Sequence, residues 1–584
     1  MEEKQTVLID DDALVLFNAR VDELIDTQNV ANMEKFIGTF DAFTPVFEDD
    51  YREAEFHYML GNAHSLIYVP QLNEWYNPNL NKVIIHYKKA LNALKRRDVN
   101  DIHQITLMSQ VETNYGNYLS QQGRFMCAKK HWKNAISLNN QPIAHTALYD
   151  SELYLSIYTQ HDHDISKAIY HQFLAYRSLC ERLKLPNNQA HFNDSYYIFD
   201  DYRTKNFKQW FEENFTLDDF DHFYRKNDKK LSKNEIAYLN WCGTNNLFID
   251  ELEIDELPDV IYPDSLSLPP IGNNRLNMTL AYHEELIYHT NFDEIKNDFC
   301  YARYLIFNAS NTPNDTVHFF NNTFKKTDDL THTIDNIKAQ HLKSAFKILY
   351  ALFDKIAYFI SHFYDLNDIS KDQQISFENL FKRPNSGKHK KEWKPHDKLK
   401  ESENTFIHAL FYILKDLRDI KDQESVSDWL NPELVKICDI RNYIEHRSFK
   451  IIDSLYADIV YSDVIEQGEI ERFNSQKGQY SDELKALYLE IKEHKGTDRH
   501  QALIDKKGQL EEKIKQIDEQ LYEKQKLSKH TLIMTDEDFT TQLMTLAELV
   551  RNSIIYLSFS ITFEERLKPK DESAIILKRE VPTK

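Results

Sequence analysis

The segment NPELVKICDIRNYIEHRSFK, residues 431–450, decides how the second half of this chain folds. It opens as a helix start and continues with apolar side chains at helical spacing, so one stripe of the helix is expected to be buried. Arg441, Asn442 and His446 are set into that stripe. A permanently charged arginine, a polar amide and a histidine that titrates near neutrality therefore lie close together on a mostly apolar helix. The apolar positions are Leu434, Ile437, Cys438, Ile440 and Ile444.

The spacing of these polar residues limits the kind of site that they can form. Positions five apart are about 140° apart on an ideal helix, so Arg441 and His446 are not expected to share a face. Asn442 and His446 are four apart and do share one. One helix alone therefore cannot surround a substrate with these groups. Two copies across a two-fold axis bring both histidines and both arginines around one cleft. The spacing predicts a site in a homodimer or a higher homo-oligomer.

The composition of the chain favours long helices. Of 584 residues only 11 are glycine and 15 are proline, so turn-forming residues are scarce. The length predicts two or three domains. The five cysteines are far apart, which argues against a disulfide framework and against a zinc site, and no metal or cofactor is expected. These features together predict an all-α protein.

The charge distribution bears on location and partners. The amino terminus is acidic where a secretory signal is basic, and no run of about 18 apolar residues is present. A cytoplasmic protein without membrane contact is therefore expected. The net charge of −22 opposes indiscriminate binding to nucleic acid. Contact with a polyanion then requires a local basic surface.

One basic loop, residues 382–400, meets that requirement. It reads KRPNSGKHKKEWKPHDKLK and carries eight Lys or Arg side chains against two acids, with a tryptophan available to stack on a base. The alternative interpretation is a solvated, flexible loop. The candidate RNA-binding residues are Lys388, Lys390, Lys391, Trp393 and Lys394.

An internal repeat precedes this half of the chain. Its clearest copy, residues 111–140, resembles the tetratricopeptide repeat, in which small residues let two helices approach and a large aromatic fills the space between pairs. An earlier copy begins near residue 54, and a third, residues 154–183, lacks the expected aromatic near Gln172. By analogy, such a stack offers a concave surface to a protein or peptide partner. The positions that carry the resemblance are Gly116, Gly123, Ala128, Trp132 and Ala135, then Gly61, Tyr87 and Ala90, then Ala168 and Ala175.

The pattern predicts four regions. After the repeats and a proline-rich connector, long amphipathic helices indicate a bundle, interrupted by two charged helices that fold back on each other. Residues 449–452 and 531–534 are expected to pair as a short ribbon at the base of that insertion. The expected boundaries are 1–200 for the acidic repeat domain, 201–275 for the junction, 276–565 for the bundle with an insertion at about 465–530, and 566–584 for a charged tail.

The segment RNYIEH within this bundle resembles the motif of the HEPN family (higher eukaryotes and prokaryotes nucleotide-binding). Its ribonuclease members carry an Arg, commonly followed by Asn, Asp or His, with four to six residues before a His. The segments LNWCGTNNLFIDEL and LAELVRNSIIYLSFSI are similar to those of a bacterial HEPN branch in which the nuclease follows helical repeats. The resemblance covers about residues 230–565.

This resemblance implies metal-independent cleavage of RNA by a homodimer. His446 is then the general base on a ribose 2′-hydroxyl or the general acid to the leaving 5′-oxygen. Arg441 stabilises charge on the phosphorane, and Asn442 orients the phosphate or the imidazole. The products are a 2′,3′-cyclic phosphate and a 5′-hydroxyl. Regulation through the repeats, in a toxin or in defence against phage, follows only by family analogy.

Each candidate residue could also be purely structural. Arg441 and Glu445 are four apart and could form a surface ion pair worth roughly a few tenths of a kcal/mol. His446 could interact with the carboxyl end of its helix. The rival function is a non-catalytic scaffold that dimerises and binds a partner protein or a nucleotide. Residues 161–164, HDHD, are expected to form a turn between repeat helices rather than a metal site.

Overall fold

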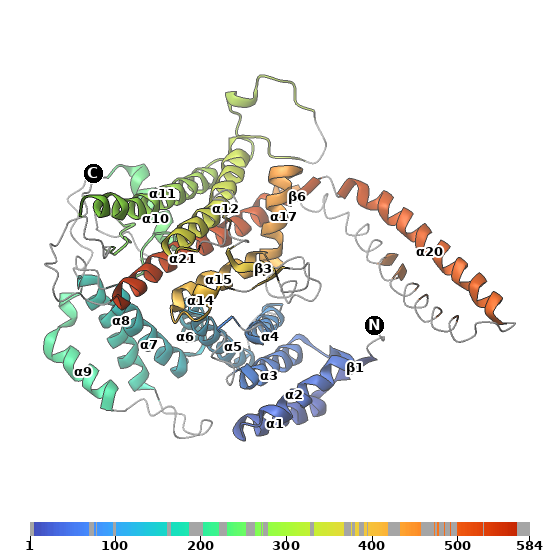
Figure 1. Ribbon diagram of the computed structural model, residues 1–584, viewed down its shortest axis with the longest axis horizontal. Helices are drawn as coiled ribbons and strands as arrows, with labels where there is room; N and C mark the ends of the chain where they lie inside the picture. The colour runs from blue at the N-terminus through green and yellow to red at the C-terminus, as the bar shows by residue number, and fades with distance from the viewer. Residues whose placement is uncertain are drawn as a thin grey trace. The chain divides into compact units, whose positions relative to one another are not determined.

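The computed structural model (Figure 1) is almost entirely helical in the part of the chain that it describes. The chain divides into two compact units, each assembled from segments that are distant in sequence. The motif unit contains Met1–Glu3, Leu305–Lys347 and Lys436–Thr545, and the repeat unit contains Lys4–Tyr304, Ile348–Val435 and Leu546–Lys584. The described residues are 5–68, 75–76, 79–96, 101–159, 165–185, 202–220, 231–252, 263–269, 271, 278–327, 332–366, 375–376, 380–384, 391–393, 395–418, 432–456, scattered positions from 472 to 491, 499–528 and 531–568.

The first residues of the repeat unit pack into one small core with the helix that follows them, α3 Asp50–Tyr68. Two short strands, β1 and β2, pair in parallel, which the helical periodicity of this segment does not predict. Phe17 lies at the centre of the core, with its ring centroid 4.8 Å from that of Phe56 and 5.1 Å from that of Phe40. The elements are β1 Gln5–Ile9, α1 Asp11–Asp26, α2 Val30–Gly38 and β2 Phe43–Phe47.

Three helical hairpins follow one another at the places where the sequence indicates repeats (Figure 1). The two helices of each hairpin pack along each other, and consecutive hairpins are joined by contacts between neighbouring helices. The prediction of a repeated helical unit is therefore confirmed as helical hairpins. Their helices are α3 Asp50–Tyr68 with α4 Asn79–Lys95, α5 Ile102–Gln121 with α6 Phe125–Asn139, and α7 Pro142–Tyr158 with α8 Ile165–Lys184.

A glycine and an aromatic ring fit together inside two of these hairpins. A Cβ atom at Gly116 would lie 2.6 Å from Nε1 of Trp132, so only glycine lets the indole occupy this space. The third hairpin has Ser156 and Gln172 at the positions 40 residues further along. The glycine is therefore absent where the large ring is absent, which accounts for the departure seen in the sequence. The equivalent pair in the first hairpin is Gly61 and Tyr87.

A histidine pairs across the two helices of every hairpin. In each case it lies on the second helix and faces an acceptor or another histidine on the first. Burial lowers the pKa of His57 to about 3, so its ring is neutral at neutral pH. Burial favours a raised pKa for Glu152, but Lys129 and His171 outweigh it and lower the pKa to about 2. The pairs are His57 Nδ1 to His86 Nδ1 at 3.1 Å, His131 Nδ1 to Glu112 Oε2 at 2.5 Å, and His171 Nδ1 to Glu152 Oε2 at 2.6 Å.

Long helices make up most of the remaining described chain (Figure 1). The predicted ribbon is present: β5 and β6 pair with Ser448 opposite Thr531, and the pairing is parallel. The all-α prediction is confirmed, and no described helix has the length and hydropathy needed to cross a membrane. The elements are α9 Tyr202–Asn214, α10 Lys233–Thr244, α11 Met278–Ser310, α12 Ile337–Phe363, β3 Lys382–Pro384, β4 Lys391–Trp393, α14 Asp397–Lys400, α15 Thr405–Arg418, α17 Pro432–His446, β5 Ser448–Ile452, α20 Arg499–Ser528, β6 Thr531–Thr535 and α21 Asp536–Leu567.

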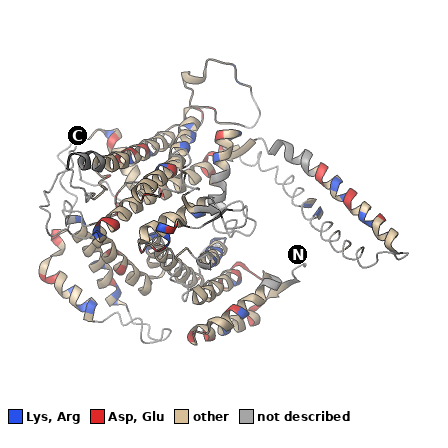
Figure 2. Ribbon diagram, in the orientation of Figure 1, with Lys and Arg blue, Asp and Glu red and all other residues tan. Residues whose placement is uncertain are grey.

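The predicted charged insertion contains the long helix α20, along which acidic and basic side chains alternate (Figure 2). Leu487 packs against Leu503 and Leu510 of α20, and Lys477 forms a 2.6 Å ion pair with Asp518. Segments before and within α20 therefore contact each other along a narrow apolar seam. This arrangement agrees with two charged helices that fold back on each other.

The two segments that flank the bundle in sequence contact each other through Arg551. This side chain is only 1% exposed, and it donates from Nε to the carbonyl oxygen of Phe248 at 2.8 Å and from Nη2 to that of Asp250 at 2.6 Å. A buried guanidinium needs such acceptors, because an unpaired one costs several kcal/mol. The segment 239–252 is thereby fixed on α21.

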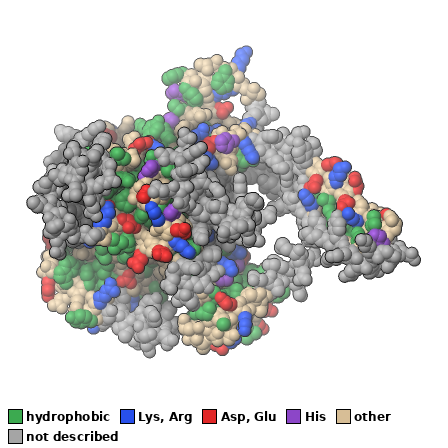
Figure 3. Space-filling model, in the orientation of Figure 1, with side chains coloured by type: hydrophobic (Ala, Val, Ile, Leu, Met, Phe, Trp, Pro, Cys, Tyr) green, Lys and Arg blue, Asp and Glu red, His purple; other side chains and the backbone are tan. Residues whose placement is uncertain are grey.

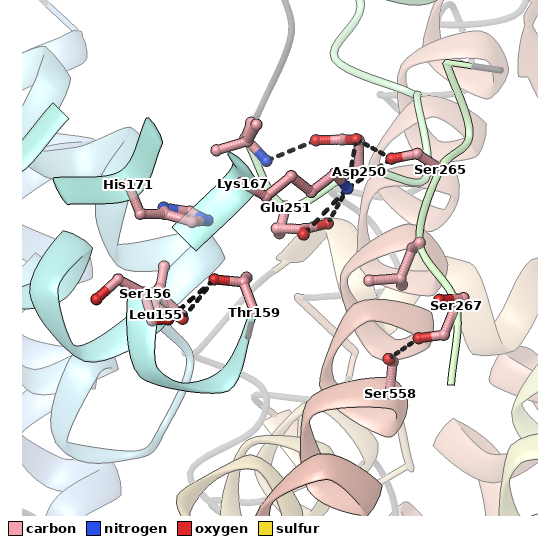
Figure 4. Close-up of polar contacts among 12 residues, drawn as sticks. Leu155, Ser156, Thr159, Lys167, His171, Asp250, Glu251, Ser265, Ser267 and Ser558 are labelled. Carbon is pink, nitrogen blue, oxygen red and sulfur yellow. Dashed lines mark hydrogen bonds and ion pairs between the residues drawn. The ribbon is translucent and has the colours of Figure 1, made fainter. Parts of the chain in front are cut away.

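A second buried cation, Lys167 of α8, binds the same segment from the repeat side (Figure 4). Its Nζ lies 3.0 Å from Oδ2 of Asp250 and 3.1 Å from both carboxylate oxygens of Glu251. Ser265 accepts a further hydrogen bond from Nζ at 2.5 Å. The third hairpin is therefore joined by buried charges to the segment that Arg551 holds.

The second hairpin contacts α15 and α21 at its turn. The Tyr556 hydroxyl of α21 accepts a 2.9 Å hydrogen bond from the backbone N–H of Met126. Gly123 has a φ of +77°, and a Cβ atom there would lie 1.8 Å from the carbonyl oxygen of Thr405. The repeat hairpins and these two helices thus form one packed body inside the repeat unit.

Replacement of Gly123 by alanine should destabilise the protein, because both the left-handed backbone and the Thr405 carbonyl oppose a side chain. We expect Gly123→Ala to lower the free energy of unfolding by about 2 kcal/mol or more, measured by urea denaturation. Gly508→Ala is the matched control, since nothing lies within 4 Å of its added Cβ on α20. That variant should be neutral or gain up to about 1 kcal/mol. Equal stability of the two variants would contradict the close approach.

Removal of the Lys167 charge should be far more costly than removal of a surface lysine. Lys167→Met leaves Asp250 and Glu251 buried without their cation, and we expect a loss of about 3–5 kcal/mol in thermal or urea unfolding. Lys130→Met removes a 2.8 Å ion pair with Glu548 whose lysine is 60% exposed, and it should cost less than about 1 kcal/mol. Similar losses for both variants would show that the buried cluster is not a stabilising constraint.

Candidate functional site

The polar motif lies at the carboxyl end of α17. Ile437 and Ile440 are fully buried and fix one side of the helix, as the apolar stripe predicts. The helix ends at His446, and β5 begins two residues later at Ser448. The next apolar residue, Phe449, is buried against Phe539 with ring centroids 4.9 Å apart. The motif is therefore held between a buried helix face and a buried strand.

Glu445 lies close to two of the predicted catalytic side chains. Its Oε2 is 3.1 Å from Nε of Arg441 and 3.7 Å from Nε2 of His446. The arginine side chain is 29% exposed and the histidine 68% exposed. One carboxylate oxygen thus brings together two groups that ideal helix geometry places about 140° apart. Sequence reasoning assigned no role to Glu445, because its spacing to Arg441 is that of an ordinary helix-surface pair.

The other polar residues of the motif are also partly accessible. Asn442 is half-buried on α17, four residues before His446. Arg447 is exposed, and its guanidinium carbon lies 5.0 Å from the ring centroid of Tyr443. This cation–π contact holds the Arg447 guanidinium against the Tyr443 ring. The accessible polar groups at this helix end are therefore Arg441, Asn442 and His446, beside a stacked Arg447.

A carboxylate at the start of α21 holds the framework around the motif. Asp536 accepts hydrogen bonds from Ser454 N at 3.0 Å and Ser454 Oγ at 2.6 Å, and from Asn314 Nδ2 at 3.2 Å. It also forms a 3.1 Å ion pair with Lys338 of α12. Burial favours a raised pKa for Asp536, but these donors outweigh it and hold the pKa below its usual value. Four chain segments of the motif unit therefore converge on one carboxylate.

A second cation, Lys343, ties α12 to the strand that follows the motif. Its Nζ donates to the carbonyl oxygen of Phe449 at 2.7 Å and lies 5.5 Å from the centre of the Phe449 ring. Burial lowers the pKa of Lys343. The start of β5 is thus fixed from α12 as well as through its pairing with β6.

The predicted basic loop contains a two-stranded antiparallel pair, with Lys382 opposite Trp393. Lys391 and Trp393 lie in β4, where the backbone but not the side chains is described. Lys388, Lys390 and Lys394 lie outside the described residues. The role of this loop in RNA binding stays a prediction.

The described residues contain no group of three or more His, Cys, Asp or Glu side chains placed to hold a metal ion. The HDHD segment, residues 161–164, lies outside the described residues. Four cysteines among the described positions are free thiols: Cys127, Cys180, Cys242 and Cys300.

Comparison with known proteins bears on the same segment. Residues 280–479 match the family model described as LA2681-like HEPN. Residues 280–479 therefore form a HEPN domain. The matched residues begin in α11 and include α12, α15, α17 and β5, so the HEPN match contains Arg441, Asn442 and His446. No curated protein and no solved structure matches the chain.

Loss of the Asp536 charge should loosen the framework around the HEPN motif. Asp536→Asn keeps the side-chain shape but weakens the bonds to Ser454 and Lys338, and we expect a loss of about 2 kcal/mol at pH 7 in urea unfolding. Because the folded-state pKa is depressed, the stabilisation is present above the unfolded pKa of about 3.9 and is lost as the pH falls below it. The difference between wild type and variant should therefore shrink on acidification.

The matched control for this prediction is Glu537→Gln. It removes an exposed charge from the same first turn of α21. We expect a change within about 0.5 kcal/mol at pH 7, because exposed charges near a helix start contribute little. A pH-independent difference between wild type and Asp536→Asn would contradict the proposed role of the carboxylate.

Proposed function

We propose that this HEPN protein is a metal-independent endoribonuclease whose site contains Arg441, Asn442 and His446. The observation that carries the proposal is the position of Glu445, within ion-pair distance of both Arg441 and His446 at the accessible end of α17. An arginine and an imidazole gathered at an accessible surface are the groups that phosphoryl transfer to a ribose 2′-oxygen requires.

The proposed reaction uses only side chains of this chain. His446 accepts the proton of a 2′-hydroxyl as its oxygen attacks the adjacent phosphorus, and the P–O5′ bond breaks. Arg441 donates to the non-bridging oxygens as negative charge develops on them, and Asn442 orients the phosphate. The leaving 5′-oxygen takes a proton from a second imidazole, which a second copy of the chain supplies. The products are a 2′,3′-cyclic phosphate and a 5′-hydroxyl, so DNA is not a substrate.

The ion pair to Glu445 describes the resting state of the proposed site. An exposed pair between residues four apart is worth only about 0.5 kcal/mol, here in the less favourable order with the arginine first. A phosphate that accepts two parallel N–H bonds from the guanidinium is a stronger partner. Arg441 can therefore exchange Glu445 for substrate at small cost.

The repeat hairpins supply the proposed point of regulation. They contact α15 and α21 through Thr405 and Tyr556, so a protein or peptide bound to the hairpins acts on helices of the same packed body. We propose a cytoplasmic effector of the toxin or anti-phage type, in which such a partner controls cleavage. The basic loop around Lys391 and Trp393 is the proposed additional RNA contact.

The rival function is a non-catalytic scaffold, and one observation favours it. The Arg441–Glu445 pair has the spacing of a stabilising surface contact, which needs no substrate. In that case the HEPN domain dimerises and binds a partner protein or a nucleotide without chemistry. Activity assays separate the two functions.

Purified full-length protein should cleave RNA in the presence of EDTA. We expect His446→Ala and Arg441→Ala each to reduce the rate by about 100-fold or more, because general acid–base and charge-stabilising groups contribute on that scale. Arg447→Ala is the matched control, since it removes a neighbouring exposed arginine and should keep the rate within a few-fold. Equal rates for all three variants, or no cleavage by the wild type, would support the scaffold.

The same variants test whether the site is shared between two copies. A mixture of His446→Ala and Arg441→Ala proteins should regain a small part of the activity, because a mixed dimer holds one guanidinium and one of the two imidazoles at the shared site, whereas each parent homodimer lacks one of these groups entirely. Size-exclusion chromatography with light scattering establishes that dimers form. Dimers that mix without regaining activity would contradict a composite site.

A further inference from the structure

A loop between α11 and α12 exposes aromatic side chains on the motif unit. We call residues 315–327 the aromatic loop; it contains a short 3-10 turn at Phe319–Asn321. Phe319 is 80% exposed and Phe324 is 63% exposed. Hydrophobic, histidine and basic side chains gather on this part of the molecule, at the top of the view in Figure 3. Several exposed apolar side chains within one short segment are less usual than a single exposed ring, and such patches mark interaction sites.

The exposure is built into the loop by polar contacts at its base. Asn321 Nδ2 and Lys326 Nζ both donate to the carbonyl oxygen of Asp335, at 2.5 and 2.9 Å. His318 Nδ1 accepts from the backbone N–H of Phe320 at 3.2 Å and so fixes the 3-10 turn. Asn336 Nδ2 donates to the carbonyl oxygen just before the loop, that of Asn314, at 2.8 Å. The rings are therefore presented by a hydrogen-bonded frame.

Two stacked pairs of rings lie at this end of the motif unit. The rings of His318 and Phe319 are 4.3 Å apart and inclined by 28°. Where the chain returns toward α12, His332 stacks on Tyr456 at 3.7 Å and 5°. Flat, preformed and exposed ring pairs suit the faces of nucleic-acid bases, which stack on aromatic side chains regardless of sequence.

Two cations follow the exposed ring of Phe324. The aromatic loop contains these two lysines and one acid, Asp315, and Asp328 and Asp329 come directly after it, in a chain with a net charge of −22. Lys325 and Lys326 directly follow Phe324 and are exposed. Rings beside cations match a strand whose bases and phosphates alternate. A purely apolar surface for a protein partner would not require lysines beside the aromatic rings.

We propose that the aromatic loop is a binding site for unpaired RNA, on which bases stack, in addition to the HEPN site itself. This inference rests on the proposed function. The loop is tied to the site strand, since Ile334 N donates to the carbonyl oxygen of Ile451 in β5 at 2.8 Å. The five residues of β5 span about 17 Å between the motif and the stacked Tyr456. A strand of several nucleotides spans a distance of that size, whereas paired bases are not free to stack on the loop.

Binding of a fluorescently labelled, unstructured RNA to full-length His446→Ala protein tests the proposal. Phe319→Leu keeps an apolar side chain but removes the ring, and it should weaken binding by about tenfold or more. Phe319→Tyr keeps the ring and should bind within about twofold of the parent. Single-stranded DNA of the same sequence should compete, because stacking does not read the 2′-hydroxyl, and duplex RNA should compete poorly.

Two control variants distinguish base stacking on the aromatic loop from an apolar contact and from a ring exposed elsewhere. Val317→Ala alters an 82% exposed apolar side chain of the same loop that cannot stack, and Tyr202→Leu removes an 82% exposed ring on α9. Both should bind RNA like the parent. Thermal midpoints should stay unchanged for all of these variants, because the side chains are exposed.

Unchanged binding by Phe319→Leu, or no binding by the parent, would overturn the inference. An equal loss for Val317→Ala would also overturn it and would indicate a general apolar contact instead of base stacking. His446-dependent cleavage that persists without Phe319-dependent binding overturns this inference alone. Phe319-dependent binding by a wild type that does not cleave overturns the proposed nuclease and leaves the stacking loop standing.

Discussion

Two buried cations and two buried carboxylates form the constraint on which the repeat unit depends. Arg551 and Lys167 approach the segment around Asp250 from α21 and from α8, and neither charge is tolerable in the interior without its acceptors. The pairing thus specifies where the third hairpin, the connecting segment and the last helix lie relative to one another. Apolar contacts alone are less selective, because they are non-directional. Charge pairing at this point gives the packed body a single arrangement.

Local sequence patterns predicted the helices and the hairpins, because those depend on periodicity and on nearby residues. The fit of Gly116 against Trp132 was visible as a small residue and a large ring at repeat spacing. The contact between Arg551 and Asp250 was not, since it joins positions about 300 residues apart and leaves no periodic trace. The sequence likewise could not predict that β5 and β6 pair in parallel, because a short apolar run carries no information about the direction of the strand it pairs with.

The candidate site was predicted in residue type and only partly in geometry. Arg441, Asn442 and His446 stood out because polar groups interrupt an apolar stripe. Ideal helix angles separated the arginine from the histidine, whereas the side chain of Glu445 reaches both. Ideal helix angles describe where each residue lies around the axis. They do not say how far a long side chain such as that of Glu445 can reach at the helix end, where the backbone continues into β5. The aromatic loop was missed for a related reason: its base is held by tertiary contacts such as the hydrogen bond from Asn321 to the carbonyl oxygen of Asp335, which leave no periodic pattern in the sequence.

The parallel pairing of β5 and β6 determines how freely the charged insertion between them can vary in length. Parallel strands cannot be joined by a tight turn, so residues 453–530 must leave the ribbon and come back to it. Once such an excursion exists, doubling its length costs only about 0.6 kcal/mol of chain entropy. The insertion that contains α20 can therefore change in length at little cost while the strands at its root keep their register.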